Sequence, residues 1–465
     1  MSDAEGLMWR LEKDPYLSST FANVSILDRP PDVDRLRRRM ERATSVIPRL
    51  RQRVHSAPAN LSPPLWVEDS DFDIDFHVRR VALPAPGSMR QLLDYVTLLL
   101  ADPFDRTRPL WQFVVVEGLE GDRAALVEKL HHTIADGEGT VQLSLQFFDF
   151  ERDSDEPDPV EVDPAVALLE QSRAHNEMWR EFIGGSLRLP LAMVRQVRDL
   201  VADPSSIPSH GASTIESVRA AMGQLTDVET SRSPLWIQRS TRRRGEVLRV
   251  PFVDVRDTAR RLGGTLNTAL LTAASDAAGR YHREFDSPID ELRASMALST
   301  RSRSGESGAT NAFSLARFLV PTAEMAPQER FDEVARRSAE AAASAGGNLS
   351  TIATLASTLP TTILTRAARL QAQTVDFATS NVKGTPIPVY VAGSEILHNF
   401  PFGPLGGVAF NLTLLSHVGS LDMGLHVDQA AIERPERLKE LLEDSFRDLV
   451  ATKPRGKKKR TRQSG

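Results

Sequence analysis

Residues 123–139 read "RAALVEKLHHTIADGEG", and this stretch decides how the rest of the chain is interpreted. An apolar, alternating segment leads into two adjacent histidines, His131 and His132, and an acid and a glycine follow at Asp136 and Gly137. The alternation predicts a β-strand, in which successive side chains point to opposite faces of a sheet. If the strand continues through the two histidines, their rings therefore face opposite ways.

Three kinds of site are compatible with the histidine pair. A metal site is disfavoured, because zinc needs three or four ligands and paired histidines usually stand four residues apart on a helix. A structural pair that satisfies buried backbone groups is the ordinary alternative. In the third interpretation one histidine takes a proton directly from a hydroxyl group, which imidazole can do near neutral pH. The chain lacks a GxSxG motif, which disfavours a serine hydrolase.

Length and composition predict a soluble protein of two or three domains. The chain has 465 residues, of which 41% are hydrophobic and 26% are charged. The absence of cysteine excludes disulfides, thiolate nucleophiles and cysteine-ligated metals. The N-terminal segment lacks the pattern of a secretion signal, and no apolar run approaches the ~18 residues of a spanning helix. We therefore expect a cytoplasmic protein that contacts a membrane or a lipid inclusion only peripherally.

The net charge of −5 hides an asymmetry along the chain. Residues 453–465 contain seven basic residues and no acidic ones, so the remainder carries −12. An acidic body disfavours a nucleic-acid-binding protein. The basic segment predicts a disordered, solvated tail, or one that binds anionic lipid with about 1 kcal/mol per basic residue near the surface.

Hydrophobic periodicity predicts two mixed halves and a connector. The expected segments are an N-terminal domain at 1–150, a helical linker at 151–215, a C-terminal domain at 216–452 and the tail at 453–465. The linker begins with the acidic, proline-rich run at 151–164 and contains an amphipathic helix at 175–201. Helices are predicted at 32–47, 88–100, 140–148, 266–285, 327–344 and 434–450, and strands at 76–83, 111–118, 123–132, 245–253 and 292–300, with two more strands joined at "HVGS" within 406–428.

Residues 131–137 match an HHxxxDG motif in full, and several other short blocks of sequence accompany it. They are "FDIDFHV" (72–78), "LPAPG" (83–87), "RPLW" (108–111), "TSNVKG" (379–384), "FPFGP" (400–404) and "FNLTLLSHVGSLDMGLHVD" (410–428). In content and order these blocks resemble the bacterial wax ester synthase/diacylglycerol acyltransferase family, within the superfamily of HHxxxDG CoA-dependent acyltransferases. Two positions depart from the family pattern. The usual Asn-Asp pair reads Asn267 and Thr268, and Lys383 replaces the first proline of "SNVPGP".

The resemblance implies an α/β (α+β) fold of two chloramphenicol-acetyltransferase-like domains joined by a helical linker, with the active site in the channel between them. It also implies a long-chain acyl-CoA as co-substrate, and diacylglycerol or a long-chain alcohol as the lipid hydroxyl acceptor. Neither a cofactor nor a metal is implied.

Roles for individual residues follow from the same resemblance. His132 is the expected general base, whereas His131, on the other face, is expected to pack or form hydrogen bonds, with a direct part in proton transfer as its alternative catalytic role. Asp136 is expected to hold the loop, with Arg301 as a candidate partner. The turn is expected to need the conformational freedom of Gly137. Gly137 and Asn267 are the expected substrate contacts, with Asn267 contributed by the second half.

Alternatives remain open at this stage. A related enzyme could acylate a glycolipid or polyketide hydroxyl with the same motif. A condensation-type domain would act on a carrier-protein partner, and a lipid-binding relative would have lost catalysis. The acceptor, the chain length and the oligomeric state are not specified by the residues.

Overall fold

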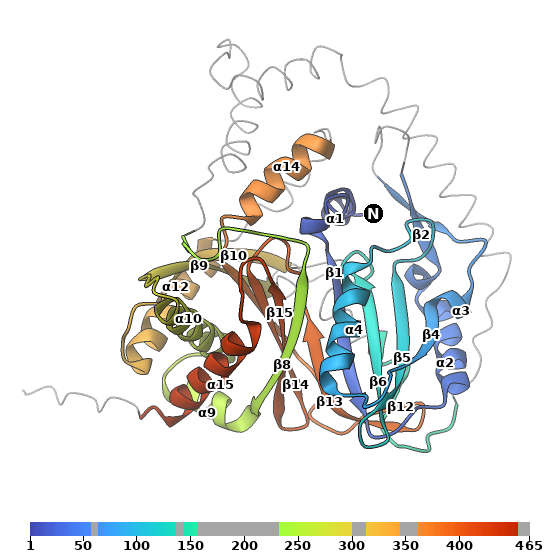
Figure 1. Cartoon of the computed structure of the whole chain (residues 1–465). Helices are drawn as coiled ribbons and strands as arrows, with labels where there is room; N and C mark the ends of the chain where they lie inside the picture. Colours follow the sequence, from blue (N-terminus) through green and yellow to red (C-terminus); the bar gives the residue numbers. More distant parts are fainter. Residues whose placement is uncertain (57–63, 136–142, 157–231, 300–312, 345–360, 454–465) are drawn as a thin grey trace, which may run out of the picture.

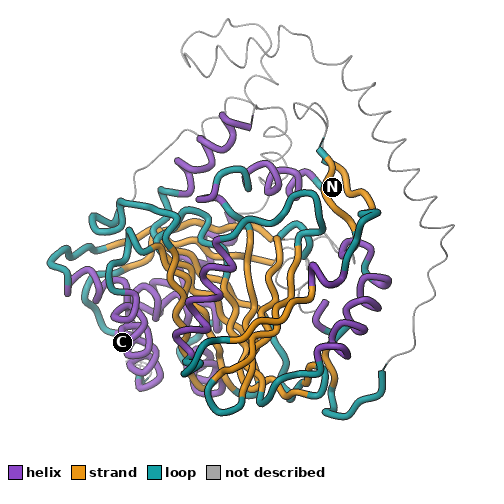
Figure 2. The backbone as a smooth tube through the Cα atoms, turned by 45° about the vertical axis from the view of Figure 1, so that its right-hand side comes forward, coloured by secondary structure: helices purple, strands orange, loops and turns teal. Residues whose placement is uncertain are grey.

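The computed structural model describes residues 1–56, 64–135, 143–156, 232–299, 313–344 and 361–453. Two large β-sheets, each with its own set of helices, make up most of the described chain (Figure 1 and Figure 2). The expected mixed α/β architecture with two sheet-rich halves is therefore confirmed. The predicted linker at 151–215 and the tail lie mostly outside the described residues, and the segment boundaries remain predictions.

The first sheet has seven strands in the order β4-β5-β6-β1-β13-β12-β7. Its central strands are antiparallel, and only β4 and β5 form a parallel pair. A separate two-stranded ribbon, β2 (Gln52–His55) and β3 (Leu65–Glu68), lies beside it. The seven strands are β1 (Thr20–Leu27), β4 (Val78–Ala82), β5 (Trp111–Leu119), β6 (Arg123–His131), β7 (Phe148–Asp149), β12 (Tyr390–Val391) and β13 (Ser394–Phe402).

Alternation along these strands divides the apolar side chains between two faces. On β5, Val114 belongs to a cluster formed with α4 (Met89–Ala101), whereas its neighbours Phe113 and Val115 join the cluster formed with α2 (Val33–Val46). Helix α4 begins with a reciprocal capping box between Ser88 and Gln91. The remaining helical segments of this half are α1 (Asp3–Leu11), η1 (Pro15–Leu17), η2 (Pro48–Leu50) and α3 (Ile74–His77).

The second sheet has six strands in the order β10-β9-β11-β14-β15-β8, and β11 runs parallel to both of its neighbours. The strands are β8 (Arg243–Pro251), β9 (Glu291–Ser299), β10 (Phe313–Pro321), β11 (Phe377–Val382), β14 (Phe410–His417) and β15 (Ser420–Asp428). The helices are α9 (Phe252–Arg261), α10 (Leu266–Glu284), α12 (Pro327–Ser344), α14 (Thr361–Ala372) and α15 (Pro435–Ala451).

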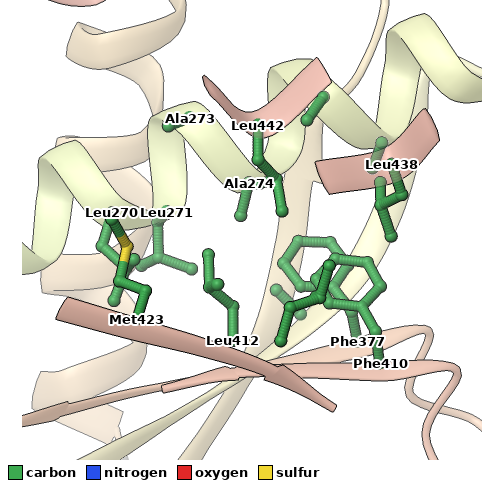
Figure 3. Close-up of a cluster of buried hydrophobic side chains, with 14 of the residues drawn as sticks. Leu270, Leu271, Ala273, Ala274, Phe377, Phe410, Leu412, Met423, Leu438 and Leu442 are labelled. Atoms are coloured by element: carbon green, nitrogen blue, oxygen red, sulfur yellow. The ribbon is translucent and has the colours of Figure 1, made fainter. Parts of the chain in front are cut away.

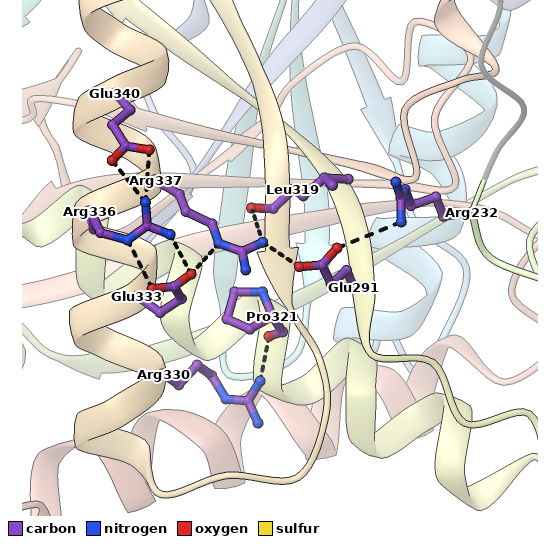
Figure 4. Close-up of polar contacts among 9 residues, drawn as sticks. All are labelled: Arg232, Glu291, Leu319, Pro321, Arg330, Glu333, Arg336, Arg337 and Glu340. Carbon is purple, nitrogen blue, oxygen red and sulfur yellow. Dashed lines mark hydrogen bonds and ion pairs between the residues drawn. The ribbon is translucent and has the colours of Figure 1, made fainter.

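The core of the second half lies between this sheet and helices α10 and α15 (Figure 3). The rings of Phe377 and Phe410 stack with centroids 4.8 Å apart, and Leu412 and Met423 extend the apolar surface along the sheet. Helix α12 is attached through arginines at the edge of the sheet (Figure 4). Arg337 bridges Glu291 of β9 at 2.7 Å and donates to a carbonyl of β10.

Two strands from the second half of the chain, β13 and β12, continue the first sheet beyond β1. β13 pairs antiparallel with β1, with Ala22 opposite Phe402, and it also packs across β15. A Cβ atom at Gly424 would lie 2.0 Å from the carbonyl oxygen of Pro401, so only glycine permits this crossing. The backbone N–H of Asn399 donates to Asp422 at 2.7 Å. The two halves are thus joined by main-chain contacts and by the fully buried carboxylate of Asp422.

Most predicted elements are present close to their predicted positions. The helix at 327–344 and the strand pair joined at "HVGS" are confirmed, as are the helices that became α2, α4, α10 and α15. Two ends differ. The strand predicted at 245–253 stops at Pro251 because α9 begins at Phe252, and the helix predicted at 140–148 cannot include Phe148, which belongs to β7.

Candidate active site

The two histidines lie at the end of a central strand of the first sheet. His131 is the last residue of β6 and is paired with Thr20 of β1. His132 begins the following turn, and its backbone N–H donates to the carbonyl of Ser19 at 3.1 Å. The strand therefore ends between the two histidines. The backbone of His132 is nevertheless still held by the segment that leads into β1.

His131 is fully engaged in the interior. Its side chain is 1% exposed, and its Nδ1 accepts from the backbone N–H of Thr133 at 3.2 Å and from the Thr133 hydroxyl at 2.8 Å. An amide N–H can only donate, so Nδ1 is unprotonated and the ring proton resides on Nε2. That nitrogen donates to Oε2 of Glu12 at 3.2 Å.

His132 has different surroundings. Its side chain is half-buried, and its ring centroid lies 4.6 Å from that of Phe21. Phe21 pairs with Leu130 across β1 and β6, so His132 packs against a residue of the Leu130 face, whereas Lys129 and His131 both lie near the Phe104 ring. The rings of the two histidines thus have separate neighbours.

The carboxylate of Glu12, at the C-terminal end of α1, collects several donors. Besides His131 it accepts from the Ser18 hydroxyl at 2.7 Å and the Ser19 backbone N–H at 2.6 Å. Burial opposes its ionisation, but the hydrogen bonds and the nearby imidazole outweigh burial, and the pKa of Glu12 is lowered. Glu12 is therefore an anion at neutral pH.

Lys129 has a structural position. It is 1% exposed, its ammonium donates to the carbonyl of Asp102 at 2.7 Å, and it lies 4.4 Å from the centroid of the Phe104 ring. Burial lowers the pKa of Lys129 to about 8. The side chain fixes the C-terminal end of α4 to β6.

The "RPLW" block packs beneath the motif. Trp111 begins β5, is fully buried and donates from Nε1 to the carbonyl of Leu50 at 2.8 Å. His77 stacks on Trp111 at 4.4 Å and donates to its carbonyl, and burial lowers the pKa of His77 to about 4. The carbonyl of Leu110 accepts from the backbone N–H of His131. This block therefore supports the end of β6.

Asn267 lies in the first turn of α10, two residues after the N-cap Thr265. Its Oδ1 accepts from Nδ2 of Asn381, in the "TSNVKG" block on β11, at 2.6 Å. Thr268 forms a reciprocal capping box with Thr265, in which each side chain accepts from the other residue's backbone N–H at 3.3 Å. A threonine thus fills the capping role at the position where the family pattern has an acid.

The last blocks meet where β13 ends. The carbonyl of Gly403 accepts from Nδ1 of His426 at 2.9 Å, and the carbonyl of Pro404 accepts from Asn411 at 2.7 Å. A Cβ atom at Gly403 would come within 2.6 Å of the Thr413 hydroxyl and 2.7 Å of the Asn411 amide. Residues of "FPFGP" and of the long block at 410–428 are therefore in direct contact.

A second set of serine, histidine and aspartate lies in the other core. Ser233 donates to Nε2 of His282 at 2.7 Å, but Nδ1 of this histidine donates to the carbonyl of Ala278. Asp376 instead accepts from the backbone N–H groups of Ser233 and Arg293. All three side chains are buried and the acid does not orient the imidazole, so the set is structural and is not a catalytic triad.

A cavity of about 280 Å³ opens at the opposite end of β1 from the histidines, past Leu27 and about 23 Å away at 3.3 Å per residue. Arg35 and Arg152 line it, and both are paired with carboxylates, Asp149 and Asp28. It is therefore remote from the motif and is not part of the candidate site.

Several predicted site residues lie outside the described residues, namely Asp136, Gly137 and Arg301. In the part of the chain that is described, no group of three or more histidine, aspartate or glutamate side chains could hold a metal ion. No helix within those ranges is long and apolar enough to cross a membrane. Glu12 and Asn381 were not singled out from the sequence, although both contact predicted site residues.

The fold is that of known acyl-transferring and condensing enzymes. The chain superimposes on the wax ester synthase/diacylglycerol acyltransferase from Marinobacter aquaeolei VT8 with a TM-score of 0.63 at 20% identity, covering 96% of this chain and 97% of that one. The first condensation domain of the calcium-dependent antibiotic synthetase gives 0.57 at 13% identity, covering 97% and 95%. At these identities the similarity defines the fold.

Sequence comparison specifies the family. The wax ester synthase/diacylglycerol acyltransferase catalytic domain matches residues 1–270, and the C-terminal domain of that family matches 309–450. A Mycobacterium tuberculosis protein named as a diacylglycerol O-acyltransferase is 30% identical over 455 residues, covering 96% of this chain and 90% of that one. The tgs1 protein of the same organism, similarly named, is 28% identical over 469 residues, covering 98% and 96%. The chain belongs to the wax ester synthase/diacylglycerol acyltransferase family and is an acyltransferase.

Proposed function

We propose that this enzyme transfers a long-chain acyl group from acyl-CoA to the hydroxyl of diacylglycerol or of a long-chain alcohol, with His132 as the general base. The observation that carries the assignment is the contrast between the two imidazoles. Both nitrogens of His131 are occupied by hydrogen bonds inside the protein. His132 is half-buried on the other face, against an aromatic ring.

The proposed reaction needs no covalent enzyme intermediate. His132 removes the proton of the acceptor hydroxyl while the oxygen attacks the thioester carbonyl. The resulting tetrahedral intermediate collapses as the carbon–sulfur bond breaks, and the CoA thiolate takes the proton back from the imidazolium. The products are an ester and CoA. General-base catalysis of this kind contributes about 10²–10⁴-fold, and orientation of the two substrates contributes further.

The other residues have supporting roles in this proposal. Asp136 holds the motif loop and Gly137 allows it to turn, as the family pattern implies. Asn267, whose amide oxygen is oriented by Asn381, contacts the substrate from the second half of the chain. Neither a cofactor nor a metal ion takes part.

Product analysis tests the substrate class. Purified enzyme is incubated with labelled palmitoyl-CoA and a panel of diacylglycerols and alcohols of increasing length, and the lipids are separated by thin-layer chromatography. Labelled triacylglycerol or wax ester is expected, with release of one CoA per ester. Labelling confined to a glycolipid or polyketide alcohol would select another acceptor, and activity only with a carrier-protein thioester would favour condensation chemistry. Binding of acyl-CoA without turnover would identify a non-catalytic relative.

A further inference from the structure

We propose that Glu12 is a positioning residue for His132, and this role rests on the function proposed above. Glu12 is the C-cap residue of α1, far from the motif in sequence. Its carboxylate contacts the side chain of His131 and the backbone of Ser19. Through these two residues it acts on the peptide of His132.

One oxygen of the Glu12 carboxylate accepts hydrogen bonds from two residues that adjoin His132. Oε2 of Glu12 accepts from the backbone N–H of Ser19 at 2.6 Å and from Nε2 of His131 at 3.2 Å. Ser19 in turn presents its carbonyl to the backbone N–H of His132 at 3.1 Å. The peptide of His132 is therefore held through its own N–H and through the preceding side chain, and both connections end on the same oxygen.

The residue after His132 is held by the same arrangement. The backbone N–H of Thr133 donates to Nδ1 of His131, which requires that the proton of this ring be on Nε2. Oε2 of Glu12 is the acceptor for that proton, so the carboxylate stabilises the tautomer on which the Thr133 contact depends. Without an acceptor at this position the ring can exchange tautomers, and the turn at His132 loses a restraint.

Helix α1 also reaches the turn by a second route. Glu5, which is 2% exposed, pairs with Arg49 at 3.0 Å, and the same guanidinium nitrogen donates to the carbonyl of Thr133 at 3.1 Å. The carboxylate of Glu12 is only 12% exposed, so solvent competes little for its hydrogen bonds. The N-terminal helix thus restrains the backbone of the motif at two points.

Three variants separate positioning from simple packing. Glu12→Met keeps the volume but removes both acceptors, and we expect kcat to fall about 10–100-fold with unchanged KM, since small displacements of a catalytic group carry costs of this size. Glu12→Gln retains one oxygen that can accept both bonds, so it should recover most of the loss. Ser18→Ala removes a donor to the other oxygen, Oε1, and should remain within about twofold of wild type. A wild-type kcat for Glu12→Met, or an equal loss in Ser18→Ala, would overturn the proposal.

Imidazole spectroscopy tests the inference independently of turnover. In the ¹⁵N-histidine-labelled wild type, His131 should show a protonated Nε2 and an unprotonated Nδ1, and Glu12→Met should shift it toward a mixture of tautomers. A protonated Nδ1 in the wild type, or an unchanged spectrum in a folded Glu12→Met, would overturn the positioning role. A wild type that acylates no lipid hydroxyl would instead reject the proposed function, and the spectra would still decide whether Glu12 sets the tautomer.

Discussion

Asn381 donates a hydrogen bond of 2.6 Å to Asn267, which joins the end of β11 to the first turn of α10. The two residues are 114 positions apart and come from two separate blocks of the family pattern. The contact explains why both blocks contain an asparagine, because one amide can orient the other. It also leaves Asn267 at the N-terminus of a helix, where polar groups are partly exposed.

The asparagine pair yields the first prediction. Asn267→Ala should lower kcat/KM, and Asn381→Ala should lower it about 2–10-fold through loss of one hydrogen bond. The double variant should be little worse than Asn267→Ala alone, because both changes remove the same contact. Thermal melting should hardly change, since the pair lies at the surface. Full additivity in the steady-state kinetics would contradict this view.

His132→Ala should abolish transfer, with a loss of about 10⁴-fold at the upper end of general-base catalysis, while the protein melts near the wild-type temperature. His131→Ala should retain more activity but melt lower, because it leaves the carboxylate of Glu12 without one of its donors. Rates measured with labelled acyl-CoA and melting curves from calorimetry check both. Equal loss of activity in the two variants, with equal melting temperatures, would reject the assignment of His132 as base.

Thr268, which stands at the position of the family's acid, is expected to act as a helix-capping residue of α10. Thr268→Ala should reduce stability by about 1 kcal/mol, because the backbone N–H of Thr265 loses its acceptor. Thr268→Asp should preserve the cap and leave kcat unchanged. Denaturant titration and acyl-transfer rates test the pair of variants. A large gain in kcat for Thr268→Asp would show that the acid has a chemical role that this chain lacks.

Glu128 should make stability depend on pH. It is fully buried beside Asn23, and burial raises its pKa to about 8 from an ordinary 4.5. The folded state therefore keeps a proton on Glu128 that the unfolded state releases above pH 4.5. The contribution of this protonated carboxyl to stability is complete below pH 4.5 and is lost as pH rises through 8. The loss is up to about 1.4 kcal/mol per pH unit.

The matched variant for that effect is Glu128→Gln, which stays neutral at every pH. Between pH 5 and pH 8 the wild type should lose more unfolding free energy than the variant, as measured by denaturant titration at several pH values. Parallel stability profiles would mean that Glu128 is ionised in the folded protein.

The basic tail gives a prediction from charge alone, because residues 454–465 lie outside the described residues. Removing residues 453–465 should weaken binding to anionic vesicles and barely affect binding to neutral ones. The difference should shrink as salt rises, since screening acts over roughly 8–10 Å at physiological ionic strength. Vesicle sedimentation measures both, and short soluble alcohols serve as the control for turnover. If anionic-vesicle binding is unchanged at low salt, the amphipathic segment at 176–201 becomes the candidate anchor.

Helices and hairpins with a regular apolar period could be predicted from sequence. Helix α12 matches its prediction because its ends are marked by Pro327 and by the end of the alanine-rich run. Strand β1 was not predicted, although Asn23 and Ser25 alternate with Val24 and Ile26 along it, and all eight of its residues are buried. The pairing of β13 with β1 could not be predicted either, because the paired residues are 369 to 380 positions apart, from Leu27 with Ile396 to Ala22 with Phe402, and local pattern carries no such information.

The part of the candidate site that lies in the motif at 131–137 could be predicted, because it is contained in one continuous segment. Strand alternation predicts separate faces for His131 and His132 if the strand continues through both. The strand ends at His131, but the two rings still have separate neighbours. Glu12 could not be found in this way, because its relation to the motif depends on how α1 docks. Asn381 lies within the "TSNVKG" block, so the sequence marks its position. Its hydrogen bond to Asn267 could not be predicted, because it depends on the packing of α10 against β11.

Strand β13 belongs to the second half of the chain but lies in the first sheet, and this has a consequence for synthesis on the ribosome. Strand β1 is complete at Leu27 and can pair with β6 about a hundred residues later, but its other edge is filled only by residues 394–402. At 5–20 residues per second, roughly 14–54 seconds of translation separate the end of β6 from the end of β13. During that interval an apolar strand edge is open to other chains. Slowing elongation between β6 and β13 should therefore raise aggregation of the nascent chain, and a cotranslational chaperone should suppress it.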